Sequence, residues 1–550
     1  MRTPWALLGL ALAACAGREN PGTAELVLYN GKIFTSSVET PWAEAVLIHG
    51  ERIVAVGTSA EVRGKAAKGA RSIDLEGRVV VPGFNDAHDH IGAAEPAVMV
   101  PTVTDPLPEP SFALVADSLA ATVARNPAGT RLEVMVGERV FSDPNARRAT
   151  LDRIAPMHPV VLVAWTGHGK IYNSAALAAA GVGDTIPDPL GGRFERKNGR
   201  LTGLIEEYAG FRLMVPGGMP DSSVRGAFRA RADSAVRVGI TSIQDMTTSL
   251  EPGQIVALAD SLDLPVRLRL IRLPMTTPVG RDILPWRAIP TRRSGRVTIS
   301  GTKYILDGTP VERLATLRAP YSDRAGWYGR LDFPPDTLKA MLAEILAAGD
   351  QPIIHAVGDS AVGLVLSTLT QLAPDSVWLR LRPRIEHGEG LSPDQYRRAL
   401  ELGVIVVQNP THLGLGAVAA ARYGPARMRI LQPMKSLLKQ GIVLGLASDG
   451  PQNPFLNLML AVIHPDNPAE KLTMEEAVRA YTHGSAWAEF QEGEKGRIAP
   501  GLLADLAVLS QDIFTIPIPS LPATRSVLTL VGGRAVYDPN GWLSAGKSGR

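Results

Sequence analysis

The sequence predicts an α/β protein: a (β/α)8 TIM barrel with an insertion after its first strand, and a small β-sandwich formed by the two ends of the chain. Three observations predict this fold. Both ends carry short alternating runs broken by Gly-containing turns, the middle alternates between strand and helix patterns, and one connection in the middle is much longer than the rest. Alternation of strands and helices is typical of a parallel sheet covered by helices.

The composition supports a large core and excludes several functional classes. Of the 550 residues, 45% are hydrophobic and 20% are charged, which excludes a disordered or collagen-like chain. The 57 Lys and Arg nearly balance the 54 Asp and Glu, and aromatic residues make up only 5%. Because the sequence has no basic stripe interleaved with aromatic residues, we expect no nucleic-acid partner. Cys15 is the only cysteine, so no disulfide forms within the chain.

Residues 1–14 have the pattern of a lipoprotein signal peptide. Arg2 precedes the apolar run WALLGLALA, which is shorter than the roughly 20 residues that span a bilayer. The run ends in Leu-Ala-Ala-Cys, which resembles the bacterial lipobox, whose cysteine is acylated and becomes the mature N-terminus. We therefore expect lipidation at Cys15 and a tether over residues 15–24. An ordinary signal peptide with an incidental cysteine is the alternative.

This anchor predicts a protein of the bacterial cell envelope, held on the periplasm-facing side of the outer membrane. Two or more acyl chains, at about 0.8 kcal/mol per buried CH₂, hold a protein firmly on a bilayer. Ala16 follows Cys15 in place of an aspartate, which resembles outer-membrane sorting. The rest of the sequence has no second long apolar stretch, so the lipid anchor is the only membrane contact that we expect.

The two ends of the chain, residues 25–82 and 497–545, are predicted to form one composite β-sandwich. AELVLYNGKIFT, AEAVLIHGERIVAVG and RSIDLEGRVVVPG alternate with period two and are broken by Gly or Asn-Gly, as in hairpins. ADLAVLS and SVLTLVGGRAVYD near the C-terminus have the same character. Because the two ends share this character, we expect them to pair into one small sandwich.

Residues 83–496 are predicted to form the barrel. Eight strands are expected, separated mostly by helical patterns such as PDTLKAMLAEILAAG: Val79–His90, Gly239–Met246, Pro265–Arg272, Val297–Asp307, Gln351–Ala356, Pro383–His387, Val404–Gln408 and Ile442–Ser448. The first two strands lie roughly 150 residues apart, whereas an ordinary βα unit has about 30. An insertion over about residues 92–220 explains this gap, and its position predicts that it covers the mouth where barrels of this kind build their sites.

Residues that can bind metals stand at the ends of several predicted strands. His88 and His90 are two residues apart in one strand, so both face the same side. His355, His387 and Asp449 end three later strands. Parallel strands in a barrel end on one face, so the five side chains converge there, and histidine with carboxylate is a metal-binding set.

This constellation resembles the amidohydrolase superfamily, and further segments resemble its YtcJ-like group (amidohydrolase family 3), which includes N-substituted formamide deformylases. VVPGFNDAHDH is similar to the first-strand signature of the superfamily, and KGRIAPGLLADLAVL to its return into the sandwich. TGHGKIYNSAAL, TKYILDGTP, HAVGD, RIEHGE, VVQNPTH and SDGP follow in the order of the group. The resemblance covers nearly the whole mature chain.

The resemblance implies a pair of divalent metal ions, with zinc as the expected metal. His88 and His90 would bind one ion, His355 and His387 the other, and Asp449 would bind metal and shuttle the proton. Lys303, in TKYILDG, matches the lysine that takes up CO₂ as a carbamate and bridges both ions. This assignment is chemically consistent, because a carbamate is an anionic oxygen donor and paired ions lower the pKa of a shared water.

Substrate contacts are expected from the insertion and from the seventh strand. The resemblance places His168 over the site, where it would polarise the substrate carbonyl, and Tyr172 and Asn173 belong to the same motif. Asn173 is also a good helix N-cap. His412 follows the seventh strand and is expected to line the pocket. Glu386 precedes His387, so alternation predicts that it faces away from the site and is structural.

The predicted function is hydrolysis of a C–N bond in an amide, N-formyl or cyclic amide substrate by metal-activated hydroxide. A lactone or ester hydrolase would use the same site. Deamination of a heterocycle on one metal is an alternative, although enzymes of that type lack the bridging lysine. A non-catalytic ligand-binding lipoprotein is the alternative from another class. The partners are a small-molecule substrate and the membrane, and the fold allows a homodimer.

Overall fold

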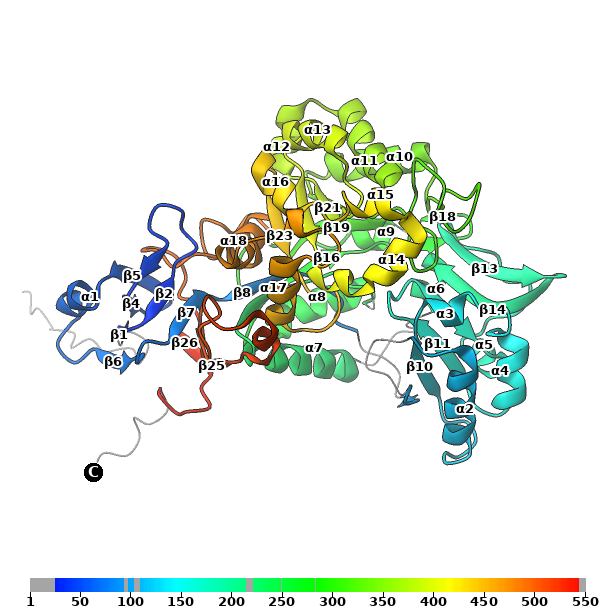
Figure 1. Cartoon of the computed structure of the whole chain (residues 1–550), viewed down its shortest axis with the longest axis horizontal. Helices are drawn as coiled ribbons and strands as arrows, with labels where there is room; N and C mark the ends of the chain where they lie inside the picture. Colours follow the sequence, from blue (N-terminus) through cyan, green and yellow to red (C-terminus); the bar gives the residue numbers. More distant parts are fainter. Residues whose placement is uncertain are drawn as a thin grey trace, which may run out of the picture.

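The computed structural model of this chain describes residues 25–92, 97–102, 109–213, 221–248, 250–281 and 283–543. The expected signal peptide, the lipidation site Cys15 and the tether lie outside the described residues. Three regions lie along the molecule in Figure 1: a sandwich, the barrel in the middle and the insertion.

Eight parallel strands form the barrel sheet, which confirms the predicted fold class. They follow one another in chain order, each paired in parallel with the next: β8 (Phe84–Asp89), β15 (Ile240–Asp245), β16 (Arg267–Arg272), β19 (Val297–Ile305), β20 (Pro352–Ala356), β21 (Arg384–His387), β22 (Ile405–Gln408) and β23 (Leu444–Leu446). The first and last strands meet where the Asp449 amide donates to the carbonyl of His88, at 3.0 Å. The eight carboxyl ends therefore face one mouth.

Helices cover the outside of the barrel because each has one apolar stripe. In α10 (Pro335–Ala347) the buried residues are Leu338, Met341, Leu342 and Ile345, the spacing of one helix face. Other covering helices are α7 (Asp221–Val236), α8 (Pro252–Ser261), α11 (Asp359–Leu372), α13 (Tyr396–Glu401), α16 (Met434–Gln440) and α17 (Pro454–Ile463). Along the part of the chain that is described, no helix has both the length and the apolar character needed to cross a bilayer.

The predicted first strand, Val79–His90, is two strands in two different sheets. β7 (Val79–Pro82) belongs to the sandwich and β8 to the barrel, with Gly83 between them. The Gly83 amide donates to the carbonyl of Asp505, and a Cβ at position 83 would lie 2.1 Å from Oγ1 of Thr241. A continuous strand is therefore replaced by a junction at which only glycine leaves room for the barrel.

The two ends of the chain pair within one sheet of the sandwich. This sheet has the order β26-β25-β24-β7-β2-β3, so that β24 (Leu506–Leu509) lies antiparallel to β7. The other members are β25 (Ser526–Val531), β26 (Arg534–Tyr537), β2 (Lys32–Phe34) and β3 (Trp42–Ala43). The second sheet is β5-β4-β1-β6: β5 (Arg52–Gly57), β4 (Ala45–His49), β1 (Glu25–Tyr29) and β6 (Arg71–Asp74). Leu28, Val46, Leu506 and Leu530 share one buried cluster between the sheets.

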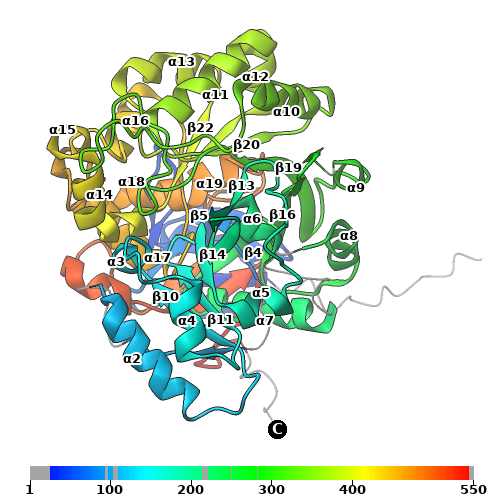
Figure 2. The ribbon, with the colours of Figure 1, turned by 90° about the vertical axis from the view of Figure 1, so that its right-hand side faces the viewer.

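The insertion between β8 and β15 has a sheet of its own. Its order is β13-β14-β12-β11-β10-β9: β13 (Gly192–Lys197), β14 (Arg200–Glu207), β12 (Gly169–Tyr172), β11 (Val160–Ala164), β10 (Leu132–Val136) and β9 (Val98–Met99). α2 (Phe112–Val123), α4 (Arg148–Ile154) and α5 (Ser174–Ala179) pack on this sheet, and α6 (Tyr208–Arg212) follows β14. Figure 2 shows β13, β14 and α6 in front of the barrel strands.

Several hydrogen bonds fix the insertion to the barrel, and two of them lie close to the barrel mouth. The Ile305 amide, at the end of β19, donates to the Tyr208 hydroxyl at 3.0 Å. The Thr166 hydroxyl donates to Glu312 at 2.6 Å. His168 follows two residues after Thr166, so this contact brings its imidazole to the barrel mouth.

Candidate metal centre

The carboxyl end of β8 brings His88 and His90 together. Their Nε2 atoms lie 3.1 Å apart, and Nδ1 of His90 lies 3.0 Å from the Thr248 hydroxyl. Between the two histidines, Asp89 points outward and accepts two hydrogen bonds from Arg231, one of 2.7 Å. The predicted alternation therefore holds at this strand end, and Arg231 is the partner that the Asp89 carboxylate requires.

Lys303 reaches the same point from β19. Its Nζ lies 3.0 Å from Nε2 of His88, and its side chain is buried. Burial lowers the pKa of the Lys303 ammonium to about 8. The amine thus stands beside the two histidines in a setting where its neutral form is easier to reach than for an exposed lysine.

Glu386 corrects one prediction, because it faces the site. Its Oε2 lies 2.6 Å from Nδ1 of His88, and Arg384 binds both of its oxygens, at 2.8 and 3.0 Å. Burial alone would raise the pKa of the Glu386 carboxyl, but Arg384 and His88 hold it well below its usual range. Glu386 therefore fixes the orientation of His88 and leaves Nε2 as its metal-binding atom.

His387 and His355 form the second part of the cluster. Their ring centroids lie 4.4 Å apart, and the ring of His387 lies 5.0 Å from that of His88. Nδ1 of His387 lies 2.9 Å from Oδ1 of Asn409. Nε2 of His355 is buried and has no hydrogen-bond partner among the described residues. A buried nitrogen without a partner marks a place for a ligand or an ion.

Asp449 lies between the two parts of the cluster. Its Oδ1 is 3.7 Å from Nε2 of His88 and 3.6 Å from Nε2 of His90, and its Oδ2 is 3.9 Å from Nδ1 of His387. Burial alone would raise the pKa of the Asp449 carboxyl, but the surrounding histidines, His88 first, hold it well below its usual range. Asp449 is therefore an ionised carboxylate in the position of a shared ligand.

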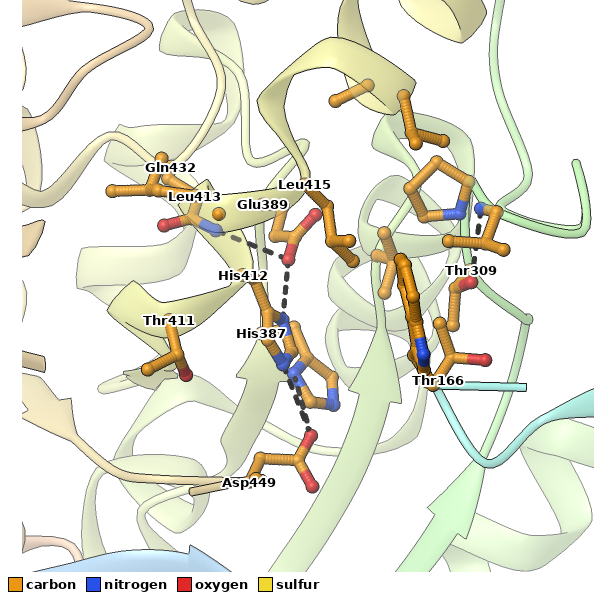
Figure 3. Close-up of a pocket in the computed structure, with 18 of the residues that line it drawn as sticks. Thr166, Thr309, His387, Glu389, Thr411, His412, Leu413, Leu415, Gln432 and Asp449 are labelled. Atoms are coloured by element: carbon orange, nitrogen blue, oxygen red, sulfur yellow. Dashed lines mark hydrogen bonds and ion pairs between the residues drawn. The ribbon is translucent and has the colours of Figure 1, made fainter. Parts of the chain in front are cut away.

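His412 connects Asp449 to Glu389. Its Nδ1 is 3.0 Å from Glu389, and its Nε2 is 3.6 Å from Oδ2 of Asp449; Figure 3 shows this line of three side chains. Although burial lowers it, the two carboxylates raise the pKa of His412 to about 10. His412 is thus a cation beside Asp449, and it lines the cavity as predicted.

His168 comes from the insertion and completes the wall. Its Nδ1 lies 2.8 Å from Oε2 of Glu207, and its ring centroid lies 4.8 Å from that of His355. Burial lowers the pKa of His168, so the neutral imidazole is favoured. The free edge of the ring faces the same cavity as His355.

Tyr172 and Asn173, predicted as substrate contacts, lie in the interior of the insertion and do not line the cavity. Tyr172 is 2% exposed and packs in the core of the insertion. Asn173 is fully buried and caps α5, where its Oδ1 accepts from the amides of Ala176 and Val160 at 2.9 and 3.0 Å. Neither residue lines the cavity described below. The motif TGHGKIYNS is thus divided between His168 at the site and two structural residues.

The cluster fits divalent metal ions. Burial, above all, lowers the pKa of His88, His90, His355 and His387, so these imidazoles are neutral at pH 7, the form that binds metals. His88, His90 and Asp449 place one ligand atom each within 4.8 Å of one another, and so do His387, His412 and Asp449. A cationic His412 has no free lone pair for a metal, so the first group is the one whose nitrogen and carboxylate ligands fit an ion as they stand.

A cavity of about 490 Å³ leads from this cluster outward. His355, His387 and Asp449 form its inner end, and apolar residues of the loop after β22, such as Leu413 and Leu415, form one wall. Its size and its largely apolar lining suit a small organic molecule.

The residues that orient the histidines are the ones that sequence reasoning missed. They are Glu386 for His88, Thr248 for His90, Asn409 for His387, Glu389 for His412 and Glu207 for His168. Glu386 and Glu389 stand in RIEHGE, beside His387, and Asn409 stands in VVQNPTH, which also contains His412. A polar residue next to a strand-end histidine was the available signal.

Comparison with known proteins agrees with this geometry. A model of the amidohydrolase family matches residues 71–537. N-substituted formamide deformylase of Arthrobacter pascens is 28% identical to this chain, over 94% of this chain and 99% of its own length. The protein LONG AFTER FAR-RED 3 of Arabidopsis thaliana is also 28% identical, over 94% of this chain and 92% of its own length.

A solved structure shares the fold. The crystal structure of an uncharacterized metal-dependent hydrolase from Pyrococcus furiosus superposes with a TM-score of 0.69 at 22% sequence identity, and covers 90% of this chain and 100% of that chain. The family match extends from the sandwich through the barrel and back to the sandwich. The chain therefore belongs to the amidohydrolase family and is a hydrolase that acts on carbon–nitrogen bonds.

Proposed function

We propose that this chain hydrolyses the C–N bond of an N-formyl or related amide, using two divalent ions, zinc by preference. His88 and His90 would hold one ion, His355 and His387 the other, with Asp449 and a carbamate on Lys303 shared between them. One observation carries the proposal. Nζ of Lys303 lies 3.0 Å from Nε2 of His88, which lies 3.1 Å from Nε2 of His90, and the Asp449 carboxylate lies within 3.7 Å of both imidazoles. Imidazole with carboxylate is a ligand set that zinc accepts.

In this proposal Lys303 becomes the bridging ligand. The ammonium first loses one proton; the neutral amine then forms an N–C bond with CO₂ and loses a second proton, so that a cation becomes an anionic oxygen donor. An unmodified ammonium 3.0 Å from His88 would repel a metal ion, and a carbamate removes that conflict. The single-metal deaminase has no use for this lysine, so the position of Lys303 supports the hydrolase.

Three groups of the chain divide the chemical work. Divalent ions, when bound, would supply a water of lowered pKa and polarise the substrate carbonyl. Asp449 would accept a proton from that water at its carboxylate and return it to the leaving amine, first as base and then as acid. His412, held by Glu389, keeps the Asp449 carboxylate oriented. His168, oriented by Glu207, donates a hydrogen bond to the carbonyl oxygen as negative charge develops there.

The test combines metal analysis with activity. Purified protein should contain divalent metal by plasma mass spectrometry, lose hydrolysis of N-alkylformamides on chelation and regain it with zinc. His88→Ala should lose both metal and activity, whereas His49→Ala, an exposed histidine of the sandwich, should keep both. A carbon-13 carbamate signal should appear after incubation with labelled bicarbonate and be absent from Lys303→Ala. Metal-free protein with undiminished activity would refute the proposal.

We also propose that Cys15 carries a lipid anchor in the bacterial cell envelope, on the periplasmic face of the outer membrane. The support is the lipobox-like LAAC at residues 12–15. Expressed in a bacterium with labelled palmitate, the full chain should incorporate label and fractionate with outer membranes. Cys15→Ser should be unlabelled and leave the membrane fraction. Label that persists in Cys15→Ser would contradict the anchor.

A further inference from the structure

The cavity is lined by a carboxylate, Glu109, for which no ion pair is seen among the described residues; the nearby Arg139 guanidinium donates to the Glu109 backbone carbonyl at 3.0 Å. Glu109 lines the cavity, is 7% exposed, and its Oε1 has no hydrogen-bond partner among the described residues. Its other oxygen accepts from the amide of Arg139 at 2.8 Å, so the side chain is held in place. A buried acceptor left without a donor is costly unless a ligand supplies one.

An aromatic ring stands beside this carboxylate. A Cβ at Gly137 would lie 2.8 Å from Cδ of Glu109 and 2.7 Å from the edge of the Trp165 indole, so the two side chains are neighbours. Trp165 lines the same cavity. A carboxylate next to an indole is a suitable environment for an alkylammonium, which gains a charged hydrogen bond from one and a cation–π contact from the other.

The other charged side chains that line the cavity also favour a cationic ligand, because most of them are acidic. Glu109, Glu389, Asp449 and Asp466 line it, and among the described residues no Lys or Arg does. Among the described residues that line the cavity, His412 is the one cationic group, and it is already paired with Glu389 and Asp449. Gln432 adds a second buried acceptor, since its Oε1 has no partner among the described residues while its Nε2 donates to Glu389.

We propose that the cavity selects amides whose far end carries a cationic amine, and that Glu109 and Trp165 recognise that amine. This inference rests on the proposed amide hydrolysis and adds the substrate class. The acyl group would lie at the metal cluster, the apolar wall would contact a carbon chain, and the ammonium would meet Oε1 of Glu109. Substrates that end in a carboxylate are excluded, because they would meet buried acidic groups with no basic side chain among the described lining residues to pair with.

Two matched series test the proposal. Monoformylated linear diamines of increasing length are compared with N-alkylformamides that carry a methyl group in place of the ammonium. At the best length, kcat/KM of the zinc-loaded enzyme should favour the cationic member at least about tenfold, the range of a charged hydrogen bond. In Glu109→Gln this preference should fall close to one. The amide oxygen of the substituted side chain can still accept from the Arg139 amide, so the fold is retained.

Binding of the free amines gives a readout that does not need turnover. By calorimetry, the diamine should bind the zinc-loaded protein about tenfold more tightly than the matched monoamine, and Glu109→Gln and Trp165→Leu should each reduce this ratio. Asp117→Asn removes the same charge from an exposed site on α2 and should leave the ratio unchanged. Diamine preference without hydrolysis would uphold the site and refute the amide reaction. Equal binding of the two amines would refute the site, whatever the hydrolytic activity.

Discussion

Three residues that shape the site have positive φ. His387 (φ 67°), Asp449 (φ 39°) and Glu207 (φ 54°) all lie in or near the left-handed region. A side chain there costs of order 1–3 kcal/mol, and such residues cluster at functional sites because the surrounding contacts hold them. Each of the three directs a ligand or its partner into the cavity, so part of the folding energy is spent on placing these groups.

This backbone geometry explains why Glu386 could not be predicted. Alternation of side chains holds only while successive residues are extended, and β21 ends at His387, whose φ of 67° leaves that conformation. Glu386 and His387 therefore both reach the site. The metal-binding residue types and their strand ends were visible in the sequence, whereas the carboxylates and amides that orient them depend on tertiary contacts.

Replacing Glu386 should weaken metal binding. Glu386→Gln removes the charge that His88 and Arg384 share, so zinc affinity and kcat/KM should each fall about 10–100-fold. Competition with a chromogenic chelator measures the affinity. Glu401→Gln, an exposed change on α13, is the matched control and should alter neither quantity. Unchanged zinc affinity in Glu386→Gln would show that His88 keeps its orientation without this carboxylate.

At the scale of elements, the sequence predicted the barrel strands well. For the insertion it predicted the position and the approximate length but not the strands. The barrel strands were marked by short apolar runs, several of them ending near a polar group, and each strand pairs with the next one in sequence. The sheet of the insertion mixes parallel and antiparallel pairs, with β12 between β11 and β14. The order of these strands depends on tertiary packing and not on the periodicity of apolar residues, so it could not be inferred from the sequence pattern.

Lys170 of β12 makes the stability of the insertion depend on pH. It is 5% exposed, its Nζ donates to the carbonyl of Gly210 at 3.2 Å, and burial lowers its pKa to about 7. The unfolded chain keeps the ordinary, higher pKa. Between about pH 7 and the unfolded pKa the unfolded state binds the extra proton, so stability rises with pH in that window.

Lys170→Met should therefore stabilise the insertion, and most strongly below about pH 7. The gain is expected to be a few kcal/mol there and to fade as pH approaches the unfolded pKa of lysine. Amide hydrogen exchange of β11 and β12 at several pH values measures it. Lys197→Met, at an exposed position of β13, should give no such trend. A gain that does not vary with pH would mean that packing, not charge burial, sets the effect.

At the scale of the whole molecule, the two ends of the chain stabilise each other. β24 pairs with β7, and Leu506 packs with Leu28 and Val46 of the first strands. The composite sandwich was predictable because both ends carry the same alternating pattern. The junction between sandwich and barrel at Gly83 was not predictable, because one continuous apolar run contributes β7 to the sandwich and β8 to the barrel.

A cavity in the C-terminal segment should therefore loosen the N-terminal one. Leu506→Ala should cost about 2–5 kcal/mol and increase hydrogen exchange in β1 and β7, more than 400 residues away in sequence. Val54→Ala, at a side chain that is 49% exposed in the same sandwich, should change stability by less than about 0.5 kcal/mol. Protection of β1 and β7 that is unaffected by Leu506→Ala would mean that the first strands are stable by themselves.

The position of β7 also sets the order of events while the polypeptide is being made. Its neighbour β24 is among the last segments to be synthesised, so until then one edge of β7 offers free backbone amides and carbonyls. For most of synthesis, therefore, β7 lacks the strand that later pairs with this edge. Shielding of that edge by a chaperone should therefore favour correct folding.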